Sequence, residues 1–318
     1  MSCFGVLGFV LAGLGCGGSG PQVVATGLLD DPSAGLAARD GEVYAVDAKG
    51  TLLALRADGG STPLVADAGL GYVIKADADH VYWTEGTTAR LVPLDGGSPR
   101  VLGSAPTGWN LQDLGASGGR LFWIETTTDP ALPVQTRLSR AYFLGPLPNA
   151  TIDTVDGLAF SFATDADSLY WAGTMGAWRR ELPDDATASL ARVSDPVVAG
   201  NVVSDGTHIF WTEQDPKGDA LYSRTVAGGA PVKLAEIARA RALAVDAPFL
   251  YLRTDRSAQG SCIERVPLQG GESVPIAQAS ADGFSLAVDA DAVFWLEKGQ
   301  LLRLDPADIA PDPGLCGG

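Results

Sequence analysis

One pattern recurs seven times along this chain of 318 residues, at intervals of about 40 residues. Each copy centres on an aromatic anchor in a short apolar run, and the spacings between successive anchors are 38, 40, 48, 40, 41 and 43 residues. A strand-rich repeat of about 40 to 45 residues is typical of β-propeller blades, each of which is a four-stranded antiparallel sheet. The sequence therefore predicts an all-β chain folded as a seven-bladed β-propeller. The anchors are Tyr44, Tyr82, Phe122, Tyr170, Phe210, Tyr251 and Phe294.

The second copy shows the four strands of one blade most clearly. GYVIKAD, HVYWTE and ARLVPL give the first three strands, and PRVLGSA follows a Gly-Gly turn as the fourth. The apolar runs are short, rich in β-branched and aromatic residues, and bounded by Gly, Pro and Asp, which favours strands over paired helices. Six blades remain the alternative, because the first copy reads YAVD in place of YWTE and the third copy is irregular.

The two ends of the repeat region are expected to meet in one blade. The seventh copy runs to Leu304, and the prolines of PADIAPDPG that follow it prevent another ladder strand. QVVATGL, at 22–28, precedes the first copy and has no partners of its own. We expect it to supply the outer strand of the seventh blade, which closes the ring and protects the sheet edge. The predicted divisions are an export signal and tether at 1–20, the propeller at 21–310 and a C-terminal tail at 311–318.

The first twenty residues differ in character from the repeats. Phe4 to Gly15 form an apolar run that is too short to span a bilayer of about 30 Å but is typical of an export signal. The run ends at Cys16 and resembles a bacterial lipoprotein signal, although Gly13 stands where that pattern has a Leu-like residue. The resemblance implies lipidation at Cys16 and a location in the bacterial cell envelope, either periplasmic or surface-exposed. A secreted protein without lipid and a cytosolic protein are the alternatives.

Two cysteines remain after the signal, Cys262 and Cys316. An even pair in an oxidising compartment favours a disulfide, which would tie the C-terminal tail to the body of the protein. Two unrelated thiols, one of them buried, are the alternative.

The charge of the chain excludes one class of partner. The formal net charge is −16, and the 22 Lys and Arg residues form no cluster of the kind that neutralises phosphates. We therefore expect no nucleic acid partner, contact with a membrane only through a lipid anchor, and a monomer.

The YWTE and FWTE segments resemble the repeats of YWTD-type and TolB-like β-propellers, in particular uncharacterised bacterial lipoproteins built from such blades. The resemblance covers residues 22–310. The family's Asp after Trp-Thr is Glu85 and Glu213 here, and YWTD propellers usually have six blades. The resemblance implies the fold and a binding role, and it transfers no catalytic residue and no cofactor.

Acidic residues recur at two offsets from the anchors. We interpret both sets as structural, because a residue needed in most blades is usually scaffolding. Those that precede the anchor are expected to cap hairpin turns, and those that follow it to accept backbone hydrogen bonds. The first set is Asp77, Asp165, Asp205, Asp246 and Asp289, and the second is Asp47, Glu85, Glu125, Glu213 and Glu297. His80 and His208 share the offset that starts the second strand, so we expect them at the bottom rim, away from any central site.

The tryptophans divide into repeated and off-pattern members. Those that follow the anchors are expected to pack between strand faces or blades, and they are Trp83, Trp123, Trp171, Trp211 and Trp295. Trp109 lies off the pattern in SAPTGWN, where an exposed Trp beside Tyr72 would suit a peptide or a sugar, with local packing as the alternative.

The top-face loops are the predicted ligand-binding region. The predicted ligand contacts are Tyr72, Trp109 and two arginines of the charged segment RTDRSAQG, Arg253 and Arg256. We therefore expect a non-enzymatic, extracytoplasmic module that binds a protein or glycan. A metal-dependent enzyme of the lactonase or lyase type, with central carboxylates as ligands, is the alternative.

Overall fold

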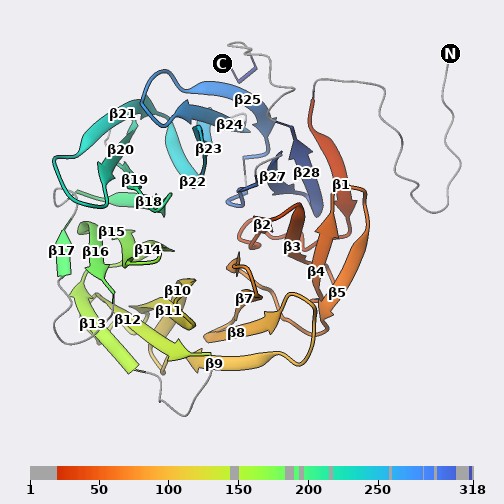
Figure 1. Cartoon of the computed structure of the whole chain (residues 1–318), viewed down its shortest axis with the longest axis horizontal. Helices are drawn as coiled ribbons and strands as arrows, with labels where there is room; N and C mark the ends of the chain where they lie inside the picture. The colour runs from red at the N-terminus through yellow and green to blue at the C-terminus, as the bar shows by residue number, and fades with distance from the viewer. Residues whose placement is uncertain are drawn as a thin grey trace, which may run out of the picture.

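The computed structural model is a ring of seven antiparallel four-stranded sheets (Figure 1). It describes residues 20–143, 150–182, 190–192, 197–214, 218–257, 260–281, 283–289, 292–305 and 315–316. The described residues contain 28 strands and no helix, and hence no helix long and apolar enough to cross a membrane. The seven-bladed prediction is confirmed, and the six-bladed alternative is wrong.

Blades 1 to 6 place their strands in chain order from the channel outward, and blade 7 does so for its three inner strands. The innermost strands are β2 (Ala37–Arg39), β6 (Ile74–Ala76), β10 (Trp109–Ser117), β14 (Ala159–Thr164), β18 (Ala199–Ser204), β22 (Arg239–Asp246) and β26 (Ala287–Asp289). The second strands are β3 (Glu42–Val46), β7 (His80–Glu85), β11 (Arg120–Thr127), β15 (Ser168–Gly173), β19 (His208–Glu213), β23 (Phe249–Ser257) and β27 (Ala292–Glu297).

The two outer layers complete the blades. The third strands are β4 (Leu52–Arg56), β8 (Thr88–Pro93), β12 (Gln135–Tyr142), β16 (Gly176–Glu181), β20 (Asp219–Thr225), β24 (Gly260–Pro267) and β28 (Gln300–Leu304). The outermost strands are β5 (Ser61–Val65), β9 (Arg100–Ser104), β13 (Ala150–Asp156), β17 (Leu190–Arg192), β21 (Val232–Ile237), β25 (Val274–Ala279) and, in blade 7, β1 (Gln22–Thr26).

The N-terminal strand closes the ring as the sequence predicts. β1 pairs antiparallel with β28, with Gln22 opposite Arg303 and Thr26 opposite Gln300 (Figure 1). The chain then crosses to blade 1, where the buried Leu28 donates its backbone N–H to Gly299 at 3.0 Å and forms a bridge with Asp47. Blade 7 is therefore built from both ends of the propeller sequence, and β1 pairs the outer edge of β28.

The hydrophobic core consists of seven clusters, each between two neighbouring blades. Successive side chains of a strand point to opposite faces, so the anchor of a second strand packs on one side of its blade and the following Trp packs on the other. Tyr44 of blade 1 thus shares a cluster with Trp83 of blade 2, and Tyr82 of blade 2 shares one with Trp123 of blade 3. All five repeated tryptophans are buried, which confirms their predicted packing role: Trp83, Trp123, Trp171, Trp211 and Trp295.

Asp residues shape the turns at the bottom face, between the first and second strands. In blade 2, Asp77 Oδ1 accepts the backbone N–H groups of Asp79 and His80, both at 2.9 Å. Asp165 and Asp205 make the equivalent bonds in blades 4 and 5. The predicted turn role is confirmed for these three carboxylates.

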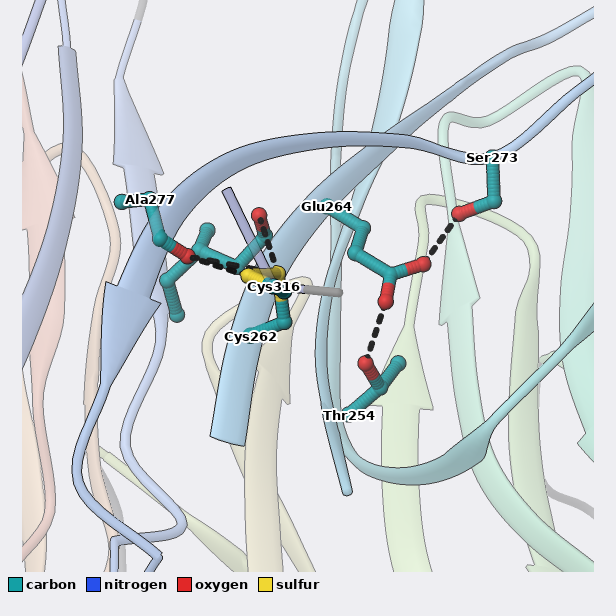
Figure 2. The surroundings of a disulfide bond; sticks show 7 residues. Thr254, Cys262, Glu264, Ser273, Ala277 and Cys316 are labelled. Carbon is teal, nitrogen blue, oxygen red and sulfur yellow. Dashed lines mark hydrogen bonds between the residues drawn. A yellow bond between two sulfur atoms is a disulfide. The ribbon is translucent and has the colours of Figure 1, made fainter. Parts of the chain in front are cut away.

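A disulfide joins Cys262 of β24 to Cys316 in the C-terminal tail, with the two Cα atoms 6.1 Å apart (Figure 2). Cys262 is fully buried, and Figure 2 shows the buried Glu264 farther along the same strand. The Glu264 carboxylate accepts hydrogen bonds from Thr254 at 2.6 Å and from Ser273. The bond therefore attaches the tail to blade 6 at a well-packed part of the sheet.

Candidate functional site

The exposed apolar side chains are concentrated on one face of the propeller. We define the top face as the face that carries the loops from second to third strands and from each outer strand to the next inner strand. Of the eleven large hydrophobic side chains exposed in the described residues, eight lie at this face. They are Leu70, Tyr72, Leu132, Val134, Phe160, Met175, Val197 and Phe284. The other three, Val23, Val101 and Val232, lie on outermost strands. A one-sided distribution of this kind marks an interaction face.

Three of these eight side chains occupy equivalent positions in their blades. Tyr72, Phe160 and Phe284 each precede the anchor by ten residues, and their exposed fractions are 41, 44 and 47 %. The residues at this offset in blades 1 to 7 are Ala34, Tyr72, Gln112, Phe160, Gly200, Arg241 and Phe284. The offset thus carries an aromatic ring in blades 2, 4 and 7 and polar groups in blades 3 and 6.

In blades 3, 4 and 6 the residue at this offset is the extra residue of a β-bulge. The pairing of β10 with β11 shifts between Leu111 and Asp113, which leaves Gln112 as the extra residue. The same shift surrounds Phe160 in β14 and Arg241 in β22. A bulge re-aims the side chain of its extra residue, and the bulges in these three blades place Gln112, Phe160 and Arg241 at the entrance of the channel. Tyr72 and Phe284 reach the same entrance from the loops before β6 and β26.

The side chains at this offset surround a cavity at the mouth of the channel. The cavity has a volume of about 240 Å³ and is lined by all seven blades. Below it lies a second cavity of about 530 Å³ that reaches the bottom face. Leu36, Ile74, Lys75, Leu243 and Leu286 line both cavities, so the two form one continuous central channel.

Polar side chains alternate with the rings around the mouth. Gln112 lines the mouth cavity, and its side-chain amide donates to Thr126 Oγ1 at 2.8 Å. Arg241 pairs with Asp255, and its guanidinium lies over the Phe284 ring at 4.8 Å. The mouth can therefore offer both flat apolar surface and hydrogen-bonding groups to a ligand.

One ion pair crosses the channel wall below the rings. Lys75 Nζ lies 3.6 Å from Asp113 Oδ1, and Asp113 Oδ2 accepts the backbone N–H of Phe162 at 2.8 Å. Burial raises the pKa of the Asp113 carboxyl, while Lys75 and the backbone hydrogen bonds oppose this rise. The carboxylate thus links blade 3 to blades 2 and 4 directly beneath the mouth.

The four predicted ligand contacts do not lie together at one site. Tyr72 lines the mouth. Trp109 begins β10, is half-buried, and lies under the Arg137 guanidinium at 4.1 Å, which corresponds to the local packing alternative. The Arg256 side chain and Cys16 lie outside the described residues. Phe160 and Phe284 were not among the predicted contacts, although they stand at the same distance before their anchors as Tyr72 does.

The prediction of Arg253 as an exposed ligand contact is wrong. Arg253 is fully buried in β23, and its guanidinium donates to the backbone carbonyls of Ser280, Ser285 and Leu296 at 3.0 to 3.3 Å. Two of these acceptors flank Phe284 in the loop before β26. Arg253 therefore holds the segment that carries one of the exposed rings, and it acts from beneath the surface.

The repeated acids after the anchors are structural, but most have partners other than those expected. Glu125 accepts the indole N–H of Trp123 at 2.7 Å, and Glu213 accepts that of Trp211 at 2.8 Å. Glu297 and Trp295 form the same pair at 3.4 Å. Residues two apart on a strand share a face, so each acid satisfies the buried indole beside it. The donor seen in these three blades is thus an indole N–H, where a backbone N–H was expected. Asp47 does accept backbone N–H groups, from Lys49 and Thr51.

A cluster of metal-ligating side chains occurs at the bottom face, away from the mouth. Asp77, Asp79 and His80 bring their potential ligand atoms within 4.8 Å of one another. Both Asp77 oxygens are already used, because Oδ1 accepts two turn N–H groups and Oδ2 accepts the Tyr82 hydroxyl. We interpret this cluster as part of the turn. The two histidines begin β7 and β19, at the bottom rim as predicted.

Comparison with known proteins supports the fold and goes no further. No protein-family model and no curated protein matches the chain. Among solved structures, oligogalacturonate lyase from Vibrio parahaemolyticus is 9 % identical with a TM-score of 0.67, covering 91 % of this chain and 94 % of its own. A nidogen/laminin complex contains a chain that is 14 % identical with a TM-score of 0.53, covering 72 % of this chain and 90 % of its own. A puromycin-hydrolysing peptidase of Mycobacterium tuberculosis is 13 % identical with a TM-score of 0.63, covering 93 % of this chain and 57 % of its own. These similarities include enzymes and a binding complex, so they establish the propeller architecture alone.

Proposed function

We propose that this protein is a non-enzymatic binding module of the bacterial envelope, related to YWTD-type or TolB-like propellers, and that its ligand is a protein or glycan. The observation that carries the proposal is the set of exposed rings Tyr72, Phe160 and Phe284, which stand at the same repeat position around the channel mouth. Exposed aromatic rings with adjacent polar groups are a common feature of binding sites.

The chemistry of the mouth supports binding over catalysis. Asp113 is the acidic residue that lines the mouth cavity, and its carboxylate is engaged by Lys75 and two backbone N–H groups. A metal-dependent lyase or lactonase needs several donor groups directed at one point. Metal analysis of the purified full chain tests this part of the proposal: a stoichiometric divalent ion that resists dialysis would favour an enzyme.

The proposed location rests on two features at opposite ends of the chain. The Cys262–Cys316 disulfide supports an oxidising compartment, and the Cys16 segment resembles a lipoprotein signal. Mass spectrometry of the protein isolated from a cell envelope should find an N-terminus at Cys16 that carries lipid. An unmodified N-terminus at Met1 would contradict both export and anchoring.

The mouth itself is tested with a matched pair of variants. The first replaces the three rings with Ala at Tyr72, Phe160 and Phe284. The second replaces Val23, Val101 and Val232, which are more exposed than the rings but lie on outer strands. Each full chain is applied to an array of envelope glycans and to a library of displayed random peptides. We expect the first variant to lose at least tenfold in affinity for any probe that the wild type binds, and the second to match the wild type. Equal binding by both variants would contradict a site at the mouth.

A further inference from the structure

A second exposed apolar group lies beside the mouth on the top face. It consists of Leu132 and Val134, in the loop from β11 to β12, and Met175, in the turn from β15 to β16. We name these three residues the rim patch. Their side chains are 39, 59 and 39 % exposed.

The rim patch spans two blades that are held together at this point. The Val134 carbonyl of blade 3 accepts the N–H of Gly157 at 2.9 Å, and the Leu158 carbonyl accepts the N–H of Thr174 in blade 4 at 2.8 Å. A Cβ at Gly157 would lie 2.7 Å from Met175 Cγ, so the Met175 side chain packs where any other residue at 157 would collide with it. The φ of Gly157 is +90°, which also favours glycine. The segment then leads within three residues to Phe160, which connects the rim patch with the mouth.

The loop that carries Leu132 is ordered by its own hydrogen bonds. Asp129 accepts the backbone N–H groups of Ala131, at 2.9 Å through its side chain, and of Leu132, at 3.0 Å through its carbonyl. A Cβ at Gly108 would lie 3.5 Å from the Leu132 side chain, which therefore rests on the adjoining loop. The loop is thus ordered before any ligand binds, which lowers the entropic cost of binding.

The charge around the rim patch is acidic. Asp129 and Asp156 are exposed beside it, and the chain as a whole carries a formal charge of −16. Complementary charges steer association and exclude partners of the same sign. A partner that covers the patch is therefore expected to carry Lys or Arg at the edge of its contact surface.

We propose, building on the proposed function, that the ligand of the mouth is a protein that also covers the rim patch with an apolar surface edged by basic residues. Leu, Val and Met side chains offer neither a flat ring for a sugar to stack on nor a partner for its hydroxyls. A glycan that covered them would bury hydroxyl groups without hydrogen bonds, which is costly. An apolar protein surface has no such cost and gains from burial of the patch.

The test uses displayed random peptides as the probe and four forms of the full chain. These are the wild type, the mouth variant described above, the outer-strand control, and a rim variant with Leu132→Ser, Val134→Ser and Met175→Ser. Selection on the wild type should enrich peptides that combine Lys or Arg with aromatic or aliphatic residues. We expect the rim variant to bind the enriched peptides at least tenfold more weakly and the outer-strand control to bind within twofold of the wild type. Binding should also weaken at least fivefold between 0.05 and 0.5 M NaCl, because screening reduces the attraction between exposed charges.

The other outcomes show whether the inference alone fails or the proposed function fails with it. If the peptides bind and only the mouth variant weakens them, the rim patch is not part of the site and the inference is wrong, while the mouth still binds. If no peptide is enriched and an envelope glycan binds in a mouth-dependent manner, the protein ligand is wrong and the binding module stands. If neither probe depends on the mouth, both proposals fail. Unchanged melting temperatures of the variants show that loss of binding is not loss of folding.

Discussion

Lys75 and Asp113 form an ion pair between two neighbouring blades, with Nζ and Oδ1 3.6 Å apart, and each is the charged exception at its repeat position. Seven residues before the anchor, where blade 2 has Lys75, the other blades have Ala37, Gly115, Ala163, Val203, Ala244 and Ala287. Nine residues before the anchor, blade 3 alone has an acid, Asp113. A pair that departs from the repeat in two adjacent blades is specific to this region of the channel wall.

We predict that Lys75→Met destabilises the protein in a pH-dependent manner. Burial raises the pKa of Asp113 and Lys75 opposes the rise, so removal of Lys75 should raise this pKa further. A raised carboxyl pKa means that the folded state favours the protonated form. The free energy of unfolding therefore falls as pH rises from the unfolded value of about 3.9 through the folded value. The variant should cost about 1 to 3 kcal/mol at pH 7 and much less at pH 4.

Urea unfolding of the wild type, Lys75→Met and Asp113→Asn between pH 4 and pH 8 checks this prediction. Asp113→Asn keeps a hydrogen-bond acceptor and removes the titration, so its stability should vary less with pH than that of the wild type. An equal cost of Lys75→Met at pH 4 and pH 7 would show that Lys75 acts through the packing of its alkyl chain.

Two glutamates at the same repeat offset should differ in their contribution to stability. Glu125 is 1 % exposed and accepts hydrogen bonds from Trp123 and, at 2.6 Å, from Arg137. The side chain of Glu85 pairs with Arg90 and is 34 % exposed. Loss of one partner of a buried pair costs about 3 to 5 kcal/mol, whereas an exposed pair contributes about 0 to 1 kcal/mol.

We therefore expect Glu125→Ala to destabilise by about 3 kcal/mol and Glu85→Ala by less than about 1 kcal/mol. Differential scanning calorimetry of the two variants compares their losses of stability. Both variants replace Glu with Ala at the same repeat position, so only the burial of the side chain and its partners differ. Similar losses in both would mean that the repeat offset, and not burial, determines the contribution of the acid.

The ring and its closure could be predicted from the sequence because the residues that form them repeat. An anchor and the following Trp point to opposite faces of a strand, so one packs against the preceding blade and the other against the next blade, as Trp83 and Tyr82 do. This requirement is the same in every blade and leaves a periodic signal. The segment 22–28 could be predicted as the closing strand for the opposite reason, because it has a strand-like sequence but lies outside the seven repeats.

The mouth could be predicted only in part, because its residues are defined by departures from the repeat. Phe160 becomes exposed through a bulge, and a bulge has no signature in the alternation of apolar residues. Alignment of all seven copies ten residues before the anchor would have grouped Phe160 with Tyr72 and Phe284. Arg253 was misassigned because its acceptors are backbone carbonyls of Ser280, Ser285 and Leu296, which no side-chain pattern reveals.

The disulfide should stabilise the fold mainly by cross-linking the unfolded chain. Cys262 and Cys316 are 54 residues apart, and closing a loop of this length contributes about 4 kcal/mol in the chain-entropy model. Cys316→Ser and Cys262→Ser should therefore lower the free energy of unfolding by about 2 to 4 kcal/mol. Reducing agent should lower the stability of the wild type and leave both variants unchanged in equilibrium denaturation. A larger loss in Cys262→Ser alone would instead identify the buried position of Cys262 as the main contribution.

Removal of β1 should destabilise the whole ring. A chain that begins at Leu28 leaves β28 unpaired along its outer edge, and it also exposes Leu301, which is packed in the cluster between blades 7 and 1. Loss of a strand's pairing and burial should lower the thermal midpoint by roughly 10 °C, since each kcal/mol moves the midpoint of a large domain by about 2 to 4 °C. Calorimetry of this chain against one that begins at Gly20 measures the difference.

A synthetic peptide of residues 20–27 provides the control for this truncation. Because β1 binds as a separate antiparallel strand, the peptide should raise the midpoint of the truncated chain in a concentration-dependent manner, and a scrambled peptide should not. Unfolding in one transition at an unchanged midpoint would show that three strands suffice for blade 7. A first transition at lower temperature that accounts for only part of the unfolding enthalpy would show that blade 7 unfolds independently of the other six.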